Sequence, residues 1–176
     1  LRNSSAASDV YKRQTIAYLY KRASTMGGSL KTKENKSPTF LVWAMADAQG
    51  TNLQRVQIIK GWLDNGESKE KVFDATCSDG LEVDKSSHRC PDNGAKVNLN
   101  DCSISKNKGS RELKTLWKDP EFIEDQEAFY YVRVLENPVC RWSTWDAIRS
   151  NQLPRSDIKS TIQERAWSSP IWITNY

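Results

Sequence analysis

A series of short segments with β-type sequence, separated by turn residues, is the feature that most constrains how this chain can fold. Residues Asp64-Asn65-Gly66-Glu67 supply the positive-φ turn of a β-hairpin between two of these segments. Residues 39–46 form a nearly continuous apolar run, which predicts a strand buried on both faces. All the segments are rich in β-branched and aromatic residues, and they are residues 39–46, 53–62, 70–76, 111–118, 128–136 and 167–174.

Only one helix is expected among these strands. Residues 143–150 begin with a serine that is suited to cap a helix, and an acidic residue follows in the first turn. Pro170 lies inside the last apolar run and favours an edge position or a bulge there, because proline has no N–H to donate. The pattern therefore predicts a mainly β fold, an antiparallel immunoglobulin-like β-sandwich with one short helix.

A long polar insertion containing three of the four cysteines interrupts the strand pattern at residues 77–110. No two cysteines have the C-x-x-C spacing typical of a structural zinc site. Disulfides are favoured because the insertion has little apolar surface to hold it, but free thiols and metal ligands that recruit His88 remain open. Among the possible pairings we favour Cys77 with Cys90 and Cys102 with Cys140, since both would anchor the base of the insertion.

Composition narrows the possible chemistry. The chain of 176 residues has one histidine, so a site built from several histidines is excluded, and we expect no catalytic residue and no cofactor within it. His88 itself is expected to be a solvated loop side chain. The formal net charge of +4 is spread along the chain without a dense basic stretch, so nucleic acid is not an expected partner. No apolar run approaches the roughly 20 residues of a membrane helix, so a membrane is not expected either.

Tryptophan is the residue type most suggestive of a ligand. The chain has seven tryptophans, and several of them lie near arginines in the C-terminal part. Such a surface can stack on sugar rings or hold an anion, which leaves a carbohydrate-binding module open as an alternative function. The other interpretation is a purely structural module whose tryptophans are core residues. The residues near arginines are Trp142, Trp145, Trp167 and Trp172, and those expected in the core are Trp43, Trp62, Trp117 and Trp172.

Three regions are expected along the chain. Residues 1–14 lack apolar periodicity and resemble a translated sequencing adapter, so we expect an artefactual or disordered tail. Residues 15–37 are expected to be a linker or a remnant of an upstream region. Residues 38–176 are expected to form the β-sandwich with its insertion.

Six ordered motifs resemble one bacterial family, the C-terminal portion of domain-of-unknown-function family 3604. They are MGGSL at 26–30, PTFLVWAMAD at 38–47, LQRVQIIKGW at 53–62, FYYVRVLENP at 129–138, RWSTWDA at 141–147 and TIQERAWSSPIW at 161–172. The resemblance implies a longer protein with an upstream hydrolase domain of the polymerase-and-histidinol-phosphatase type, which would hold divalent metal through histidines and carboxylates.

On this basis the chain is expected to be a non-catalytic accessory β-sandwich of a metal-dependent hydrolase, with its own upstream domain as partner. The resemblance and the cysteines together favour a periplasmic or secreted protein. We expect the contact with the catalytic domain, or the border of its cleft, to be formed by side chains in the loops around the last strands. These residues are Arg141, Trp142, Trp145, Glu164 and Arg165.

Overall fold

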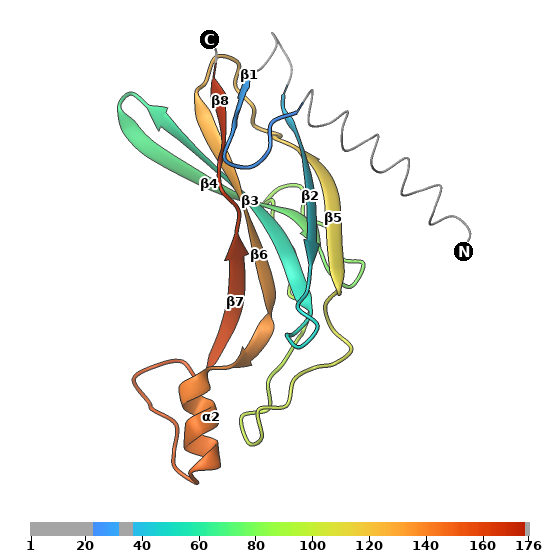
Figure 1. Cartoon of the computed structure of the whole chain (residues 1–176), viewed down its shortest axis with the longest axis vertical. Helices are drawn as coiled ribbons and strands as arrows, with labels where there is room; N and C mark the ends of the chain where they lie inside the picture. Colours follow the sequence, from blue (N-terminus) through green and yellow to red (C-terminus); the bar gives the residue numbers. More distant parts are fainter. Residues whose placement is uncertain (1–22, 32–36, 175–176) are drawn as a thin grey trace, which may run out of the picture.

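The structure is a computed structural model that describes residues 23–31 and 37–174. The predicted tail, residues 1–14, lies outside the described residues, as does most of the predicted linker. The described residues form eight strands and one helix (Figure 1). The strands are β1 (Ser29–Lys31), β2 (Thr39–Met45), β3 (Leu53–Asp64), β4 (Glu67–Cys77), β5 (Glu112–Lys118), β6 (Ala128–Cys140), β7 (Thr161–Trp167) and β8 (Ile171–Thr174), and the helix is α2 (Trp142–Arg149).

The strands form two sheets. The larger sheet has six strands in the order β1-β8-β6-β3-β4, and β7 also pairs with β6. The smaller sheet contains β2 and β5, which run antiparallel. Every pairing in the larger sheet is antiparallel except β1 with β8, which is parallel. Residues 29–31 were assigned to the linker from sequence, and in the structure they form β1 and join this sheet.

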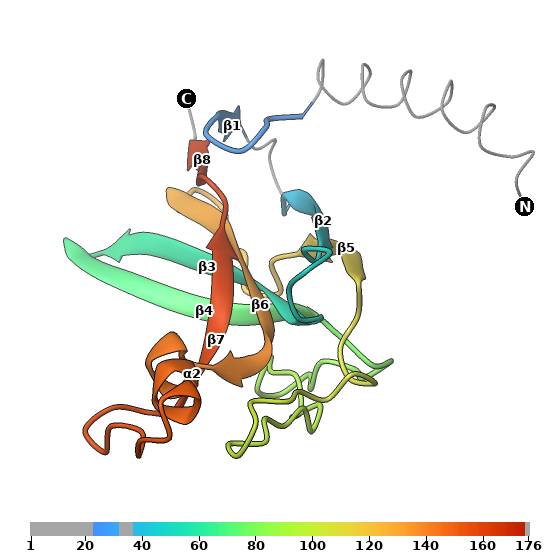
Figure 2. The ribbon, with the colours of Figure 1, turned by 60° about the horizontal axis from the view of Figure 1, so that its bottom comes forward.

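The two sheets pack face to face, and Figure 2 shows β2 and β5 on one side of the larger sheet. Alternate residues of each strand point into the space between them, as the period of a β-strand requires. Phe40 from β2 and Leu113 from β5 meet Val56, Ile58 and Tyr130 from the larger sheet in the buried core. This burial is the main source of stability, at roughly 1.5–3 kcal/mol for each large apolar side chain.

The connectivity is that of an immunoglobulin-like sandwich. In that fold strands B and E lie in one sheet, C, F and G lie in the other, and C′ extends the second sheet. Here β2 and β5 correspond to strands B and E. In the larger sheet, β3 corresponds to C, β6 to F, and the β7–β8 pair to G. Strand β4 extends the sheet beside β3, as C′ does beside C. The predicted mainly β sandwich with one short helix and a cysteine-containing insertion is confirmed.

Several details differ from the prediction. β2 is buried on one face only, because the smaller sheet has no layer covering its outer side among the described residues. Trp43 and Trp172, which we expected in the core, are 59% and 48% exposed. Arg141 rather than Ser143 is the N-cap of α2, it makes no side-chain capping bond, and the first turn is not acidic. The single strand expected over residues 167–174 is divided, because β7 ends at Trp167 and β8 begins at Ile171. Pro170, expected at an edge or a bulge, lies in the break between them.

A polar cluster lies inside the core between the sheets. The side chains of Lys60 and Asp119 are 4% and 0% exposed, and Lys60 Nζ lies 2.7 Å from Asp119 Oδ2. The Tyr130 hydroxyl donates to the same oxygen at 2.7 Å, and the Glu121 backbone N–H donates to Asp119 Oδ1 at 2.8 Å. Burial and the neighbouring Asp119 carboxylate raise the pKa of Tyr130, so this hydroxyl stays protonated and remains a donor.

Candidate functional site

The predicted interface residues do not form one site. Arg141 and the tryptophans of α2 lie at the end of the sandwich where β6 leads into the helix (Figure 1). Trp142 is 75% exposed, whereas Trp145 is 36% exposed and has the Arg149 guanidinium 5.2 Å from the centre of its ring. The Arg141 side chain donates to the Lys159 carbonyl at 3.1 Å, which fastens the helix to the loop that follows it.

Glu164 and Arg165 lie on β7 and point to opposite faces of the sheet, because they are consecutive in a strand. Glu164 acts on a neighbouring carboxyl group, that of Glu136 on β6. The pKa of Glu136 is raised first by burial and further by the negative charges of Glu164 and Asp47. Arg165 is paired across the strands with Leu135. Glu164 therefore belongs to an acidic group at the sheet edge, and Arg165 belongs to the opposite face.

The four cysteines form two disulfides with the pairing that we favoured from sequence. Cys77, at the end of β4, is bonded to Cys90, and Cys102 is bonded to Cys140, at the end of β6. The disulfides indicate an oxidising environment. Because all four sulfurs are used, neither free thiols nor a metal site with His88 is formed. His88 is not a fully solvated side chain, since it packs against the ring of Phe73 and lies 3.5 Å from Glu121.

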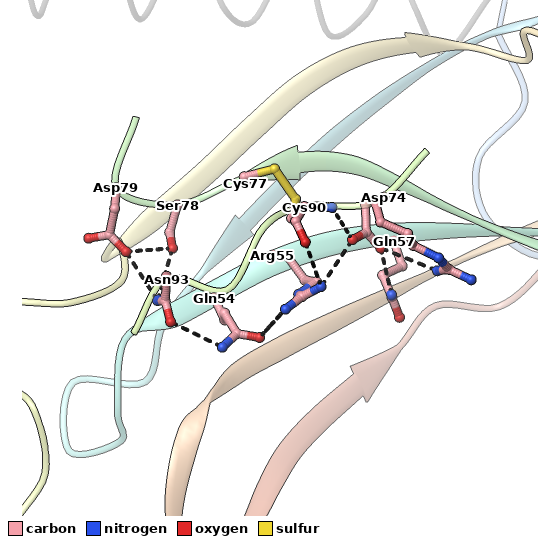
Figure 3. The surroundings of a disulfide bond; sticks show 10 residues. Gln54, Arg55, Gln57, Asp74, Cys77, Ser78, Asp79, Cys90 and Asn93 are labelled. Carbon is pink, nitrogen blue, oxygen red and sulfur yellow. Dashed lines mark hydrogen bonds and ion pairs between the residues drawn. A yellow bond between two sulfur atoms is a disulfide. The ribbon is translucent and has the colours of Figure 1, made fainter. Parts of the chain in front are cut away.

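Beneath the first disulfide, a buried polar network holds the insertion on the outer face of β3 and β4 (Figure 3). Asp74 accepts hydrogen bonds from Gln57 at 2.6 Å, from Arg55 at 3.1 Å and from the backbone N–H of Cys90 at 2.7 Å. The Asp74 side chain is fully buried, and its charge is opposed by Arg55. Since donors from the protein already occupy the acceptor positions of this carboxylate, Asp74 is typical of a structural residue rather than of a reactive acid.

A second part of the network fixes the far end of the insertion. The backbone N–H of Gly109 donates to both carboxylate oxygens of Asp79 at 2.9 Å, and the side-chain amide of Asn93 donates to Asp79 Oδ2 at 3.0 Å. Partial burial acts to raise the pKa of Asp79, but hydrogen bonds from Gly109, Ser78 and Asn93 outweigh it and lower the pKa below its ordinary value.

We predict a pH-dependent contribution of Asp79 to stability. A carboxyl whose pKa is lowered by folding stabilises the native state above its unfolded pKa, and this contribution is lost as the pH falls through the folded value. Asp79→Asn should therefore lower the melting temperature at neutral pH, and the difference from the unchanged chain should shrink below about pH 4. Circular dichroism melts across this range measure it. A constant difference at every pH would contradict the assignment.

Two surfaces remain as candidates for binding. The first is the outer face of β2 and β5, where Leu41, Trp43, Met45 and Leu116 are 61%, 59%, 73% and 71% exposed. Leu41 and Leu116 are directly paired across the two strands, and Lys114 lies 5.9 Å from the centre of the Trp43 ring. A concentrated apolar face of this kind on a sheet is typical of an interaction surface.

The second surface is a pocket of about 600 Å³ near the hairpin end of β3 and β4. Its wall includes Phe129 and Trp172, whose ring centres are 5.1 Å apart. Neither this pocket nor the apolar face was predicted, although Trp172 is one of the tryptophans expected to stack on a ligand. Of the four tryptophans near arginines in the sequence, Trp142 and Trp145 are on α2, whereas Trp167 and Trp172 are on β7 and β8.

The described residues include no group of three or more histidine, cysteine, aspartate or glutamate side chains arranged to hold a metal ion. The resemblance implies the divalent metal for the upstream hydrolase domain rather than for this chain. Over the same residues, no helix has the length and apolar character required to span a bilayer.

Comparison with known proteins supports the family and no specific activity. Neither the curated proteins nor the solved structures include a match. The sequence model of a family described as "Protein of unknown function (DUF3604)" matches residues 3–175. This range includes most of the segment 1–14, so the match does not support the predicted foreign origin of that segment. The chain belongs to the DUF3604 family.

Proposed function

We propose that this chain is an accessory β-sandwich of an exported metal-dependent hydrolase, and that it is not catalytic by itself. Membership of the family supports the link to a longer protein through the upstream hydrolase domain that the resemblance implies. The two disulfides support export to the periplasm or beyond the cell. In the longer protein, the catalytic metal would be held by the upstream domain.

The observation that carries this proposal is the apolar outer face of β2 and β5. Its four large side chains, Leu41, Trp43, Met45 and Leu116, are all more than half exposed. Covering such side chains contributes roughly 1.5–3 kcal/mol each. Their neighbours on the same face, Lys114 and Glu112, are 3.5 Å apart and form a polar border. An apolar centre with a polar border is the usual anatomy of an interface.

This face is a better docking surface than the one predicted from sequence. On α2, Trp145 is partly covered by Arg149, and Arg141 is fixed to the helix-to-strand loop, so much of their surface is already used within the chain. The role of Arg141, Trp142, Trp145, Glu164 and Arg165 at the catalytic domain stays a prediction. Alanine substitution in the full-length enzyme tests it, and unchanged kinetics with an unchanged melting temperature would contradict it.

We predict that the paired substitution Trp43→Ser and Leu116→Ser separates this sandwich from the upstream domain. In the protein expressed from its complete reading frame, the variant should melt at least about 4 °C lower, in two transitions instead of one, because the domains no longer stabilise each other. Differential scanning calorimetry measures both effects.

The matched control is Leu153→Ser, which removes an even more exposed apolar side chain, at 93%, from the loop after α2 and should leave the melting curve unchanged. Two outcomes contradict the proposal. One is a calorimetric trace of the paired variant that coincides with the control. The other is a genomic reading frame whose start codon lies directly before residue 15, since no upstream domain would then exist.

A further inference from the structure

We infer that the pocket at the hairpin end of β3 and β4 binds a neutral glycan chain. This function is independent of the proposed docking, because the pocket involves the larger sheet and the docking face belongs to the smaller one. The pocket has a volume of about 600 Å³, which is within the range of ligand sites. The β3–β4 hairpin and β8 both lie in the upper part of Figure 1, and β6 lies between β8 and β3 in the sheet.

The pocket wall includes an aromatic pair, Phe129 and Trp172, whose arrangement depends on one glycine. Gly61 is paired with Phe129 across β3 and β6, and Phe129 is paired with Trp172 across β6 and β8. A Cβ atom at Gly61 would collide with the ring of Phe129, so the glycine lets this ring lie across the sheet. The neighbouring Tyr131 ring is nearly parallel to it, at an angle of 14°.

Part of this aromatic surface is open to solvent. Trp172 is 48% exposed and lies beside Phe129 in the pocket wall. Flat aromatic faces bind the apolar C–H faces of sugar rings, and their stiff side chains lose little entropy when a ligand binds. A ligand that stacks here must therefore have a flat apolar face of similar size.

The rest of the lining is polar and suited to hydroxyl groups. The carboxylates of Glu70 and Glu127 accept hydrogen bonds from hydroxyls, and Ser68 can donate or accept them. Gln126 lines the same pocket, and its Oε1 atom is buried without a hydrogen-bond partner among the described residues. An acceptor left in this state is unusual in a folded protein, and a rotation of the amide would offer it to a ligand hydroxyl.

Charge selects among the possible glycans. Apart from Asp125, the lining contains two carboxylates, from Glu70 and Glu127, but one ammonium, from Lys69. The Lys69 ammonium also forms an ion pair with the Glu67 carboxylate, with Nζ 2.6 Å from Oε2. This balance repels sulfated, phosphorylated and uronic acid chains, since bringing like charges together in a partly closed site is costly. A neutral chain keeps the stacking and the hydroxyl bonds without that repulsion.

We predict binding of the 176-residue chain, with its disulfides formed, to at least one neutral hexasaccharide from a set of cellohexaose, xylohexaose and mannohexaose. Isothermal titration calorimetry gives the dissociation constant. Trp172→Ala should weaken binding at least about tenfold, because it removes the main exposed ring, and Trp172→Phe should retain part of the affinity.

The matched control is Trp142→Ala, which removes an exposed tryptophan from α2. This helix lies at the other end of the molecule from β8 (Figure 1), so the affinity should be unchanged. A polygalacturonate hexamer and choline are included as an anionic and a cationic probe. The inference is overturned if no neutral hexasaccharide binds, if Trp172→Ala binds as well as the control, or if either charged probe binds more tightly than every neutral chain.

Discussion

Replacing Asp119 with alanine is expected to lower the free energy of unfolding by about 3–5 kcal/mol, which is a large part of the stability of a single domain. The substitution leaves the Lys60 ammonium buried without its charge partner, since its side chain is 4% exposed. It also removes the acceptor of the Tyr130 hydroxyl. Urea denaturation followed by tryptophan fluorescence measures the change.

Two further variants test whether burial, rather than the ion pair alone, determines the loss of unfolding free energy in Asp119→Ala. Glu67→Gln breaks a pair with Lys69 that has a similar distance, 2.6 Å, but exposed side chains, and it should cost at most about 1 kcal/mol. Adding Lys60→Met to Asp119→Ala should recover part of the lost stability, because an apolar side chain then replaces the uncompensated charge. Equal losses for Asp119→Ala and Glu67→Gln would contradict this account of the core.

The strand pattern and the hairpin were predictable because local chemistry dictates them. Asn65 and Gly66 adopt φ values of 50° and 83° in the turn between β3 and β4, which are the left-handed values that these two residue types accept most readily. The presence of disulfides was predictable for a different reason, since a polar insertion with little apolar surface is favoured to have covalent links, whereas the sequence left the pairing open.

The exposed face of β2 was not predictable from its own residues. Both faces of residues 39–45 are apolar, so the alternation that marks a half-buried strand is absent from the sequence. Whether a second layer covers Leu41 and Trp43 depends on the rest of the protein. β7 was missed for the opposite reason, because its residues are polar and largely exposed and its pairing with β6 compensates for the weak pattern.

The pocket could not be found from sequence because it depends on register. Gly61, Phe129 and Trp172 are far apart in the chain and come together only through the pairing of β3, β6 and β8. A shift of one residue in either pairing would move one of these side chains to the other face of the sheet. The aromatic composition suggested stacking, but it grouped Trp172 with tryptophans that lie on α2.

Removing the disulfide between Cys102 and Cys140 by paired serine substitutions is expected to lower the free energy of unfolding by about 4 kcal/mol. The bond joins residues separated by 38 positions and fastens the far part of the insertion to the end of β6. The other disulfide, between Cys77 and Cys90, closes a separation of 13, so its removal should cost about 3 kcal/mol. Denaturation of both variants under oxidising conditions provides the comparison.

Because of the polar network, removal of the first disulfide should be distinguishable from removal of the second. Without the first disulfide, Asp74 still accepts the Cys90 backbone N–H, so that end of the insertion stays attached to β4. On either side of Cys102, the nearest described side-chain bonds to the body of the sandwich are at Asn93, with Gln54 and Asn137, and at the Lys108 carbonyl, which accepts from Asn52 and Asn137. Limited proteolysis should therefore cleave between residues 95 and 107 in the Cys102/Cys140 variant and spare the other variant. If the variant lacking Cys77 and Cys90 loses more stability, loop length does not set the contribution of these bonds, and the network beneath Cys90 depends on its disulfide.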